Sequence, residues 1–409
     1  MSELSLREGL MTLSPARVPA LGVRRLTATL YGYSFLDDLV LLYPVYALLF
    51  SDTGLSVWQI SSLFVLWSLT GVLLEIPSGA WADAVSRRTL LWLGPLLGSA
   101  GFALWVIVPS YPAFAAGFVL WGVRGALGSG ALEALVYEEL DRLGAADRYA
   151  RIMGRANAAA LLGVVAAMAL AGPVFDFGGY PAVGLASVLA GLLTAAVAAG
   201  FPEHRAPVVA AEADADGVAG WTAMLRASLT EARRDRAVRH ALLLVPAVSA
   251  VWGALDEYTP LLVRETGVAD ATVPWWLLLV WLGPTIGGLL AGGAERLGRA
   301  GLAALLAGSA VALAAGGAAG TPLALAAIAL AYGGFQLATV LADSRLQHSI
   351  EGPGRATLTS AAGVGTELAT IAVYGGYGLL ASTTTHGAAF ALFAVPYVLT
   401  AGLVAAWRR

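Results

Sequence analysis

The sequence predicts an all-α membrane protein in which twelve transmembrane helices form two six-helix bundles with pseudo-twofold symmetry. Composition is the first reason: of 409 residues, 58% are hydrophobic and only 12% are charged, against about 25% charged residues in ordinary soluble domains. The mean hydropathy is +0.75. The second reason is that apolar residues gather in windows of about 20, the helix length that crosses a hydrocarbon layer of about 30 Å.

Twelve such windows follow one another along the chain. In order they are 26–49, 57–82, 89–109, 111–139, 152–175, 180–201, 240–263, 272–294, 300–319, 321–346, 356–381 and 385–407. Gly is abundant, with 49 residues, and several windows contain Pro. Both are compatible with membrane helices, because Gly lets helices pack closely in lipid and Pro is tolerated there.

The basic residues predict the orientation. All 24 are Arg, and only Arg124, within a span, and Arg264 lie away from the tails, loops and span ends on the side of the N-terminus. Basic residues concentrate on the cytoplasmic side of membrane proteins. We therefore expect a multi-pass protein of the inner (cytoplasmic) membrane with both termini in the cytoplasm. The first residues lack a separate apolar segment and read as a cytoplasmic tail.

A polar stretch divides the chain near its middle. Residues 201–220, FPEHRAPVVAAEADADGVAG, are rich in Ala, Pro and Asp, and the residues that follow show apolar side chains at helical spacing. We expect a linker with an amphipathic helix on the inner membrane surface; a merely solvated linker is the alternative. The expected domains are a cytoplasmic N-terminal tail (1–25), an N-terminal six-helix bundle (26–201), the cytoplasmic linker (202–239), and a C-terminal six-helix bundle with a short tail (240–409).

The two halves resemble each other. FLDDLV in the first predicted span is matched by ALDEYT in the seventh, and SGAWADAVSRR after the second span is matched by AGGAERLGR after the eighth. The matched positions are Asp37 with Asp256, Asp38 with Glu257, Asp83 with Glu295, and Arg87 with Arg299. Because the matches occur in the same order and at the same place relative to the spans, they indicate duplication of a six-helix unit.

The loop after the second span carries a motif of a Gly, an Asp four residues later and then two Arg: Gly79, Asp83, Arg87 and Arg88. With it the chain resembles transporters of the major facilitator superfamily. Ala84 and Ser86 stand where that motif usually has Arg and Gly. RGALGSGA, which begins at Arg124, resembles the superfamily's fourth-helix motif, and AGPVFDFGG shares only its Gly-Pro pair with a fifth-helix motif of proton-driven exporters.

The resemblance implies a secondary transporter whose substrate binds near the midplane between two halves that rock about the site. It also implies that the four motif residues form a cytoplasmic gate. Gly79 would allow close helix approach, and Asp83 would accept hydrogen bonds from a helix N-terminus or an Arg. In the alternative, Arg87 and Arg88 only anchor the topology.

Acidic residues within the spans predict the ion or substrate path. A charge at a helix centre costs about 2.5 to 3.5 kcal/mol, so it usually faces a cavity or a partner. Burial raises the pKa of a carboxyl and a nearby Arg lowers it, so a carboxyl between these influences can exchange a proton. A structural ion pair is the alternative. The candidates for proton coupling or substrate binding are Asp37, Asp38, Arg124, Glu133, Asp256 and Glu257.

We expect Arg124 to pair with an aspartate of the first span. At about 1.5 Å per residue, Arg124 lies roughly 20 Å into its span and the two aspartates about 17 Å into theirs from the other side. Adjacent helical residues point about 100° apart, so the aspartates would differ in role, and Asp37 is the favoured partner. Glu133, nine residues further on, would point away from Arg124.

Aromatic residues near the acidic positions suit a lipophilic or cationic ligand, although aromatics also anchor helices at membrane interfaces. The expected cavity aromatics are Tyr33, Trp252 and Tyr258, with Tyr43 and Tyr46 nearby.

Composition also excludes several activities. The chain has no Lys, which a Walker phosphate loop and a Schiff-base enzyme require, and no Cys. Its four His form no HExxH motif, and GxSxG is absent. We therefore expect that the protein is not an enzyme, needs no cofactor or metal, and binds no nucleic acid. We expect a monomeric, proton-coupled antiporter in the lipid bilayer. It would export a small lipophilic or cationic molecule by alternating access. The alternatives are a proton-coupled nutrient importer, and a membrane sensor or enzyme on a transporter-like scaffold.

Overall fold

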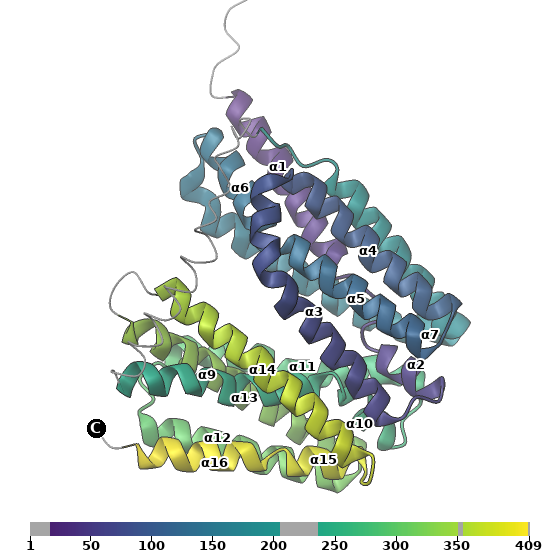
Figure 1. Cartoon of the computed structure of the whole chain (residues 1–409), viewed down its shortest axis with the longest axis vertical. Helices are drawn as coiled ribbons and strands as arrows, with labels where there is room; N and C mark the ends of the chain where they lie inside the picture. The colour runs from purple at the N-terminus through teal and green to yellow at the C-terminus, as the bar shows by residue number, and fades with distance from the viewer. Residues whose placement is uncertain (1–16, 205–235, 351–354, 408–409) are drawn as a thin grey trace, which may run out of the picture.

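The computed structural model describes residues 17–204, 236–350 and 355–407, and every regular element in these ranges is a helix (Figure 1). The all-α fold predicted from the sequence is confirmed. The predicted amphipathic helix of the linker and most of the predicted N-terminal tail lie outside the described residues. The domain boundaries therefore stay predictions.

The helices of the first half follow the first six predicted spans. They are α1 (Arg17–Asp37), α2 (Tyr46–Asp52), α3 (Val57–Ala84), α4 (Arg87–Ile107), α5 (Tyr111–Gly128), α6 (Ala131–Arg142), the 3-10 turn η1 (Ala146–Arg148) and α7 (Tyr149–Ala198). α7 covers the fifth and sixth spans, which are separated by a break at Gly178 and Gly179. Gly179 has a φ of +59°, a left-handed conformation that Gly adopts at little cost.

The second half repeats this pattern. Its helices are α9 (Arg236–Asp256), α10 (Thr259–Glu265), the turn η2 (Asp270–Thr272), α11 (Val273–Ala294), α12 (Arg299–Ala319), the turn η3 (Pro322–Ala324), α13 (Leu325–Ser349), α14 (Arg355–Ala381), α15 (His386–Leu392) and α16 (Val395–Ala406). In Figure 1 the helices up to α7 gather in one bundle and those from α9 onward in another.

Nine segments of the described chain are helical, long and apolar enough to cross a membrane. One of them, Ala146–Ala198, holds two predicted spans. The two predicted spans not among the nine contain α1, which carries Arg24, Arg25 and Asp37, and α14, which carries Glu367. These charges lower the hydropathy of helices that pack within the bundles like their neighbours.

The first helix of each half is interrupted, although a single continuous span was predicted in each. The first predicted span is not one helix through both aspartates, because α1 ends at Asp37 and α2 begins at Tyr46. In the second half, α9 ends at the matched Asp256 and α10 begins at Thr259. The expected angle of about 100° between Asp37 and Asp38 therefore does not apply. The internal repeat extends to the position of the breaks.

Two further elements support the repeat. α4 begins at Arg87 and α12 begins at Arg299, the pair matched in the sequence. Ser86, which replaces the usual Gly of the loop motif, is the N-cap of α4, where its side chain accepts a hydrogen bond from the Thr89 N–H at 3.2 Å. Ser is among the best N-cap residues, so the departure from the motif stabilises the start of this helix.

Candidate functional site

A cavity of about 310 Å³ lies between the two halves, at the breaks of their first helices. Residues of both halves line it: Tyr43, Pro44, Tyr46, Trp67, Trp121, Val164, Met168, Asp256, Glu257, Pro260, Leu277 and Trp281. Its volume is at the lower end of the range for small-molecule pockets. Because each half contributes one wall, relative movement of the halves changes the shape of this cavity.

Stacked aromatic rings form the wall from the first half. Trp121 on α5 stacks on Tyr43 with centroids 5.1 Å apart and on Trp67 with centroids 4.9 Å apart. Of the aromatic residues that line the cavity, Tyr43 was expected near the acidic positions, whereas Trp67, Trp121 and Trp281 were not predicted. A usable signal was present, because Trp121 precedes Arg124 by three residues and so shares its helix face.

Two neighbouring carboxyls form the polar part of the opposite wall. Glu257 accepts a hydrogen bond from the hydroxyl of Tyr46, which joins the two halves across the cavity. The Asp256 side chain makes no hydrogen bond or ion pair with any other described residue. The arrangement offers a ligand one carboxylate that has no partner among the described residues and a second that accepts a single hydrogen bond.

Arg124 pairs with Asp37, as predicted. Its Nη2 atom lies 2.6 Å from Asp37 Oδ1, and the same nitrogen donates to the backbone carbonyl of Asp37 at 3.1 Å. This carbonyl is at the end of α1, where the last carbonyls of a helix lack intrahelical partners and a cation is favoured. The Arg124 guanidinium therefore both neutralises Asp37 and caps the broken helix.

The other predicted residues of the first half are not part of this pair. Asp38, half-buried, has no hydrogen bond or ion pair within the described part of the chain, and Glu133 is exposed near the start of α6. Tyr33 is buried and packs edge-to-face on Phe201, with centroids 5.6 Å apart. It therefore lies in the core of the first bundle and not at the cavity.

The predicted aromatics of the second half lie on either side of Asp256. Trp252 is half-buried one turn earlier, where its indole N–H donates to Thr339 Oγ1 at 3.3 Å. Tyr258 is fully buried, and its hydroxyl lies 2.7 Å from Ser61 Oγ of the first half. Tyr258 thus contributes to the contact between the halves, while neither residue lines the cavity described above.

The halves are sealed together at the end of the molecule where α2 and α10 lie (Figure 1). Arg264 at the end of α10 donates to Asp52 Oδ1 at 2.5 Å and to Ser51 Oγ at 2.6 Å. The hydroxyl of Tyr180, just after the break in α7, also donates to Asp52. At the opposite end the two bundles diverge in Figure 1.

The gate motif lies at that divergent end. Arg87, 8% exposed, forms an ion pair with Glu138 of α6 at 2.6 Å, and its backbone N–H donates to Glu203 at 2.8 Å. Arg88 is exposed. Gly79 and Asp83 are within α3, and the contacts of both lie outside the described part of the structure. The described contacts of the motif lie within the first half, to α6 and to the segment that follows α7.

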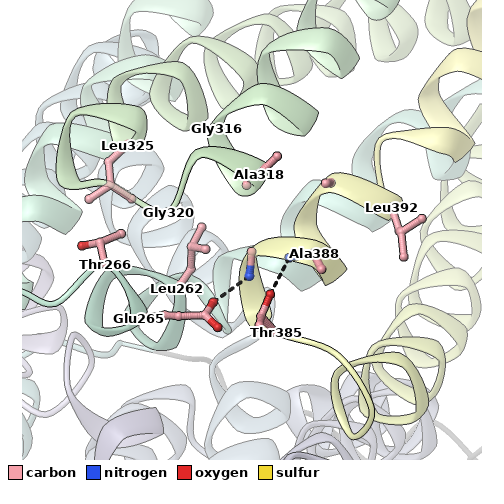
Figure 2. A pocket seen from close by; sticks show the side chains of 13 residues that line it. Leu262, Glu265, Thr266, Gly316, Ala318, Gly320, Leu325, Thr385, Ala388 and Leu392 are labelled. Carbon is pink, nitrogen blue, oxygen red and sulfur yellow. Dashed lines mark hydrogen bonds between the residues drawn. The ribbon is translucent and has the colours of Figure 1, made fainter.

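A second cavity, of about 560 Å³, lies within the second half between α10, α12 and α15 (Figure 2). Small and apolar residues dominate its lining, and its one carboxylate, Glu265, accepts hydrogen bonds from the backbone N–H groups of His386 and Gly387 at 3.2 and 2.7 Å. Glu265 therefore stabilises the start of α15. This cavity receives no residue from the first half, so movement between the halves does not act on it directly. Among the described residues, no group of three His, Cys, Asp or Glu side chains could hold a metal ion.

Comparisons with known proteins give the class of this molecule. The chain matches the family model described as Major Facilitator Superfamily over residues 29–373, and it belongs to that superfamily. It is a multi-pass membrane transporter of a small molecule. A search of curated protein sequences finds no match to the chain.

Solved transporter structures share the fold. A structure of a variant of the nucleoside transporter NupG covers 93% of this chain and 99% of its own, with TM-score 0.77 and 14% identity. A D-xylose-proton symporter covers 95% and 98%, with TM-score 0.66 and 15% identity, and an auto-inhibited peptide transporter of the POT family covers 94% and 98%, with TM-score 0.66 and 16% identity. At these identities the likeness concerns the fold, and the three named substrates differ.

Proposed function

We propose that this protein is a proton-coupled antiporter that exports a small, flat organic cation. The observation that carries the proposal is the cavity between the halves, where stacked rings of the first half face Asp256 and Glu257 of the second. Aromatic faces attract cations through the ring quadrupole, and carboxylates supply the opposite charge. Among the described residues that line the cavity, none is basic.

Protons and substrate would compete for the same carboxyls. A cation held by ionised Asp256 is released when that carboxyl takes a proton, and the empty site binds a new cation when the proton leaves. Asp38, which has no described partner at the matched break, is a second candidate for carrying the proton. Alternating exposure to the two sides of the membrane would then couple inward proton movement to outward movement of the cation.

The Arg distribution favours an orientation in which the sealed end faces outward. In that orientation the described conformation has its divergent end toward the cytoplasm, the side from which an exporter takes its substrate. The Arg264 contacts would break and the motif at Arg87 would take part in closing the inner side as the transporter turns outward.

A proton-coupled importer is the second candidate. Two of the solved structures that share the fold, those of a nucleoside transporter and of a D-xylose-proton symporter, favour the importer. Stacked aromatic rings also bind nucleobases and sugar rings. The two carboxyls of the cavity favour the exporter of a cation over the importer, since a neutral solute does not need both carboxyls.

Transport into everted membrane vesicles tests the proposal. Ethidium, a flat aromatic cation, is the probe, and uridine is the neutral comparison. Acidification of the vesicle lumen should drive ethidium accumulation by the wild-type protein, because the lumen corresponds to the cell exterior. Asp256→Asn should abolish this accumulation, while Asp176→Asn, which removes an exposed carboxylate with no described partner, should leave it unchanged.

The outcomes separate the candidates. Exit of preloaded uridine together with protons from the acidified lumen, in place of ethidium accumulation, would replace the export proposal with the importer. Equal accumulation by wild-type protein and Asp256→Asn would refute the role given to the cavity carboxyls.

A further inference from the structure

The hydroxyl of Tyr397 on α16 bridges two backbone groups of α9. It accepts a hydrogen bond from the Trp252 N–H at 2.8 Å and donates to the Val248 carbonyl at 3.0 Å. Residues 248 and 252 are four apart, so these are the two groups that bond to each other in an uninterrupted α-helix. A side chain of another helix therefore takes part in the hydrogen-bond ladder of α9, one turn before Asp256.

The place of this bridge matters because α9 is within the membrane. A backbone N–H or carbonyl without a partner costs several kcal/mol in hydrocarbon, which normally keeps every helical turn closed. A side chain inserted into the ladder is one of the recognised causes of a helix bend. With the Tyr397 hydroxyl between them, the two groups keep partners when this turn of α9 opens.

Tyr397 itself is rigidly held. Its side chain is fully buried, and its ring stacks on Phe335 of α13 with centroids 3.7 Å apart and planes at 14°. The neighbouring Trp252 is also fixed by α13, through the bond from its indole N–H to Thr339. The last turn of α9 is thus connected to α13 and α16, which belong to the same bundle.

The two halves hold the ends of their broken helices in different ways. In the first half a guanidinium, Arg124, binds the carboxylate and carbonyl of Asp37 at the end of α1. In the second half Asp256 has no ionic partner among the described residues, and the neutral bridge from Tyr397 supports the preceding turn. Asp37 is thereby neutralised, while Asp256 is positioned and left available.

We propose that Tyr397 is a positioning residue, whose hydroxyl sets the direction of the last turn of α9 and so places Asp256 at the cavity wall. The inference rests on the proposed function for the part that concerns ligand binding. It adds that a residue on α16, outside the cavity lining, controls the affinity of the site.

Tyr397→Phe tests this inference because it keeps the ring and its stacking and removes only the hydroxyl. The loss of a bridging hydrogen bond should raise the KM for ethidium in equal-pH exchange by about tenfold, with the maximal rate changed less than about twofold. In the Asp256→Asn background the same substitution should have no further effect on ethidium binding, measured by the quenching of Trp fluorescence. Tyr377→Phe is the matched control, since Tyr377 is equally buried and its hydroxyl contacts His386 at 2.7 Å.

Hydrogen–deuterium exchange gives a second readout that needs no transport. The amides of residues 249–256 should exchange at least about tenfold faster in Tyr397→Phe than in wild-type protein, and those of α12 should not change. Because this readout is independent of ethidium, failure of the proposed function and failure of the bridge can be told apart. Unchanged exchange in this segment, or a KM change no larger than that of Tyr377→Phe, would overturn the inference.

Discussion

Arg124 connects a charge pair to a helix end. Its side chain is 12% exposed and that of Asp37 28% exposed, so both charges are largely removed from water. Gly98 of α4 gives the arginine its space, because a Cβ at that position would lie 2.9 Å from Arg124 Cδ. The pair is thus fixed by three helices, which explains why Asp37 is held while its neighbour Asp38 is not.

Removal of one partner should destabilise the protein. Asp37→Asn leaves the Arg124 charge without its counter-ion, and breaking a buried pair costs about 3 to 5 kcal/mol. We expect a clearly lower unfolding temperature in detergent for Asp37→Asn and Arg124→Gln, and a smaller effect of the second substitution once the first is present. Asp38→Asn is the control, with a temperature close to wild type. An equal loss for Asp37→Asn and Asp38→Asn would show that the pair is not the cause.

Helix α7 packs directly on the break in the first helix. A Cβ on Gly163 would lie 2.2 Å from the carbonyl oxygen of Phe35, a distance that real atoms do not adopt. The unwound stretch is stabilised from the same helix further along, where Ser187 Oγ accepts the Leu42 N–H at 2.9 Å. The shape of the break therefore depends on α7 as much as on its own residues.

Gly163→Ala should displace the break. Overpacking in a tight contact costs about 1 to 3 kcal/mol, so both the unfolding temperature and the ethidium transport rate should fall. Gly154→Ala, in the same helix, is the matched control, because a Cβ there meets nothing within 4 Å and Ala favours a helix by up to about 1 kcal/mol. If the two variants behave alike, α7 does not support the break through Gly163.

The contacts between α2 and α10 hold one end of the molecule closed. Arg264 is 26% exposed and Asp52 40% exposed, and such a pair contributes only about 0 to 1 kcal/mol. A weak ion pair between Arg264 and Asp52 suits a transporter, since the conformations with this end closed and open must both remain accessible. Buried aromatic contacts between the halves, such as Phe64 on Tyr258 with centroids 5.2 Å apart, supply the rest of the free energy that holds this end closed.

Arg264→Gln should therefore shift the conformational equilibrium without unfolding the protein. Spin labels on cysteines introduced at Ser56 and Ala269, in a chain without native Cys, report the separation of the halves at this end. We expect up to about a fivefold larger open fraction, the change that corresponds to about 1 kcal/mol. Arg155→Gln should change nothing, and the charge-reversed pair Arg264→Asp with Asp52→Arg should restore the closed fraction. The same distribution of spin-label distances in all four proteins would show that the Arg264–Asp52 pair does not hold this end closed.

The fold and much of the charge arrangement could be predicted from the order of the residues. Hydropathy windows are long and recur twelve times, because a helix that crosses lipid needs about 20 apolar residues, and this requirement is local. The repeat that matches Asp37 with Asp256 could also be recognised in the sequence. So could the pairing of Arg124 with Asp37, because a charge at mid-membrane depth has few partners.

How these residues form a site depends on contacts between helices that are far apart in the chain. The interruptions of the first and seventh predicted spans were not predicted, because where α1 stops depends on Arg124, Ser187 and Gly163, which come from other helices. The cavity needed Trp67 and Trp121 from the first half beside Asp256 from the second, and Tyr33 turned out to lie in the core. Hydropathy depends on neighbours along the chain, whereas helix ends in lipid exist only where distant side chains satisfy the freed backbone groups.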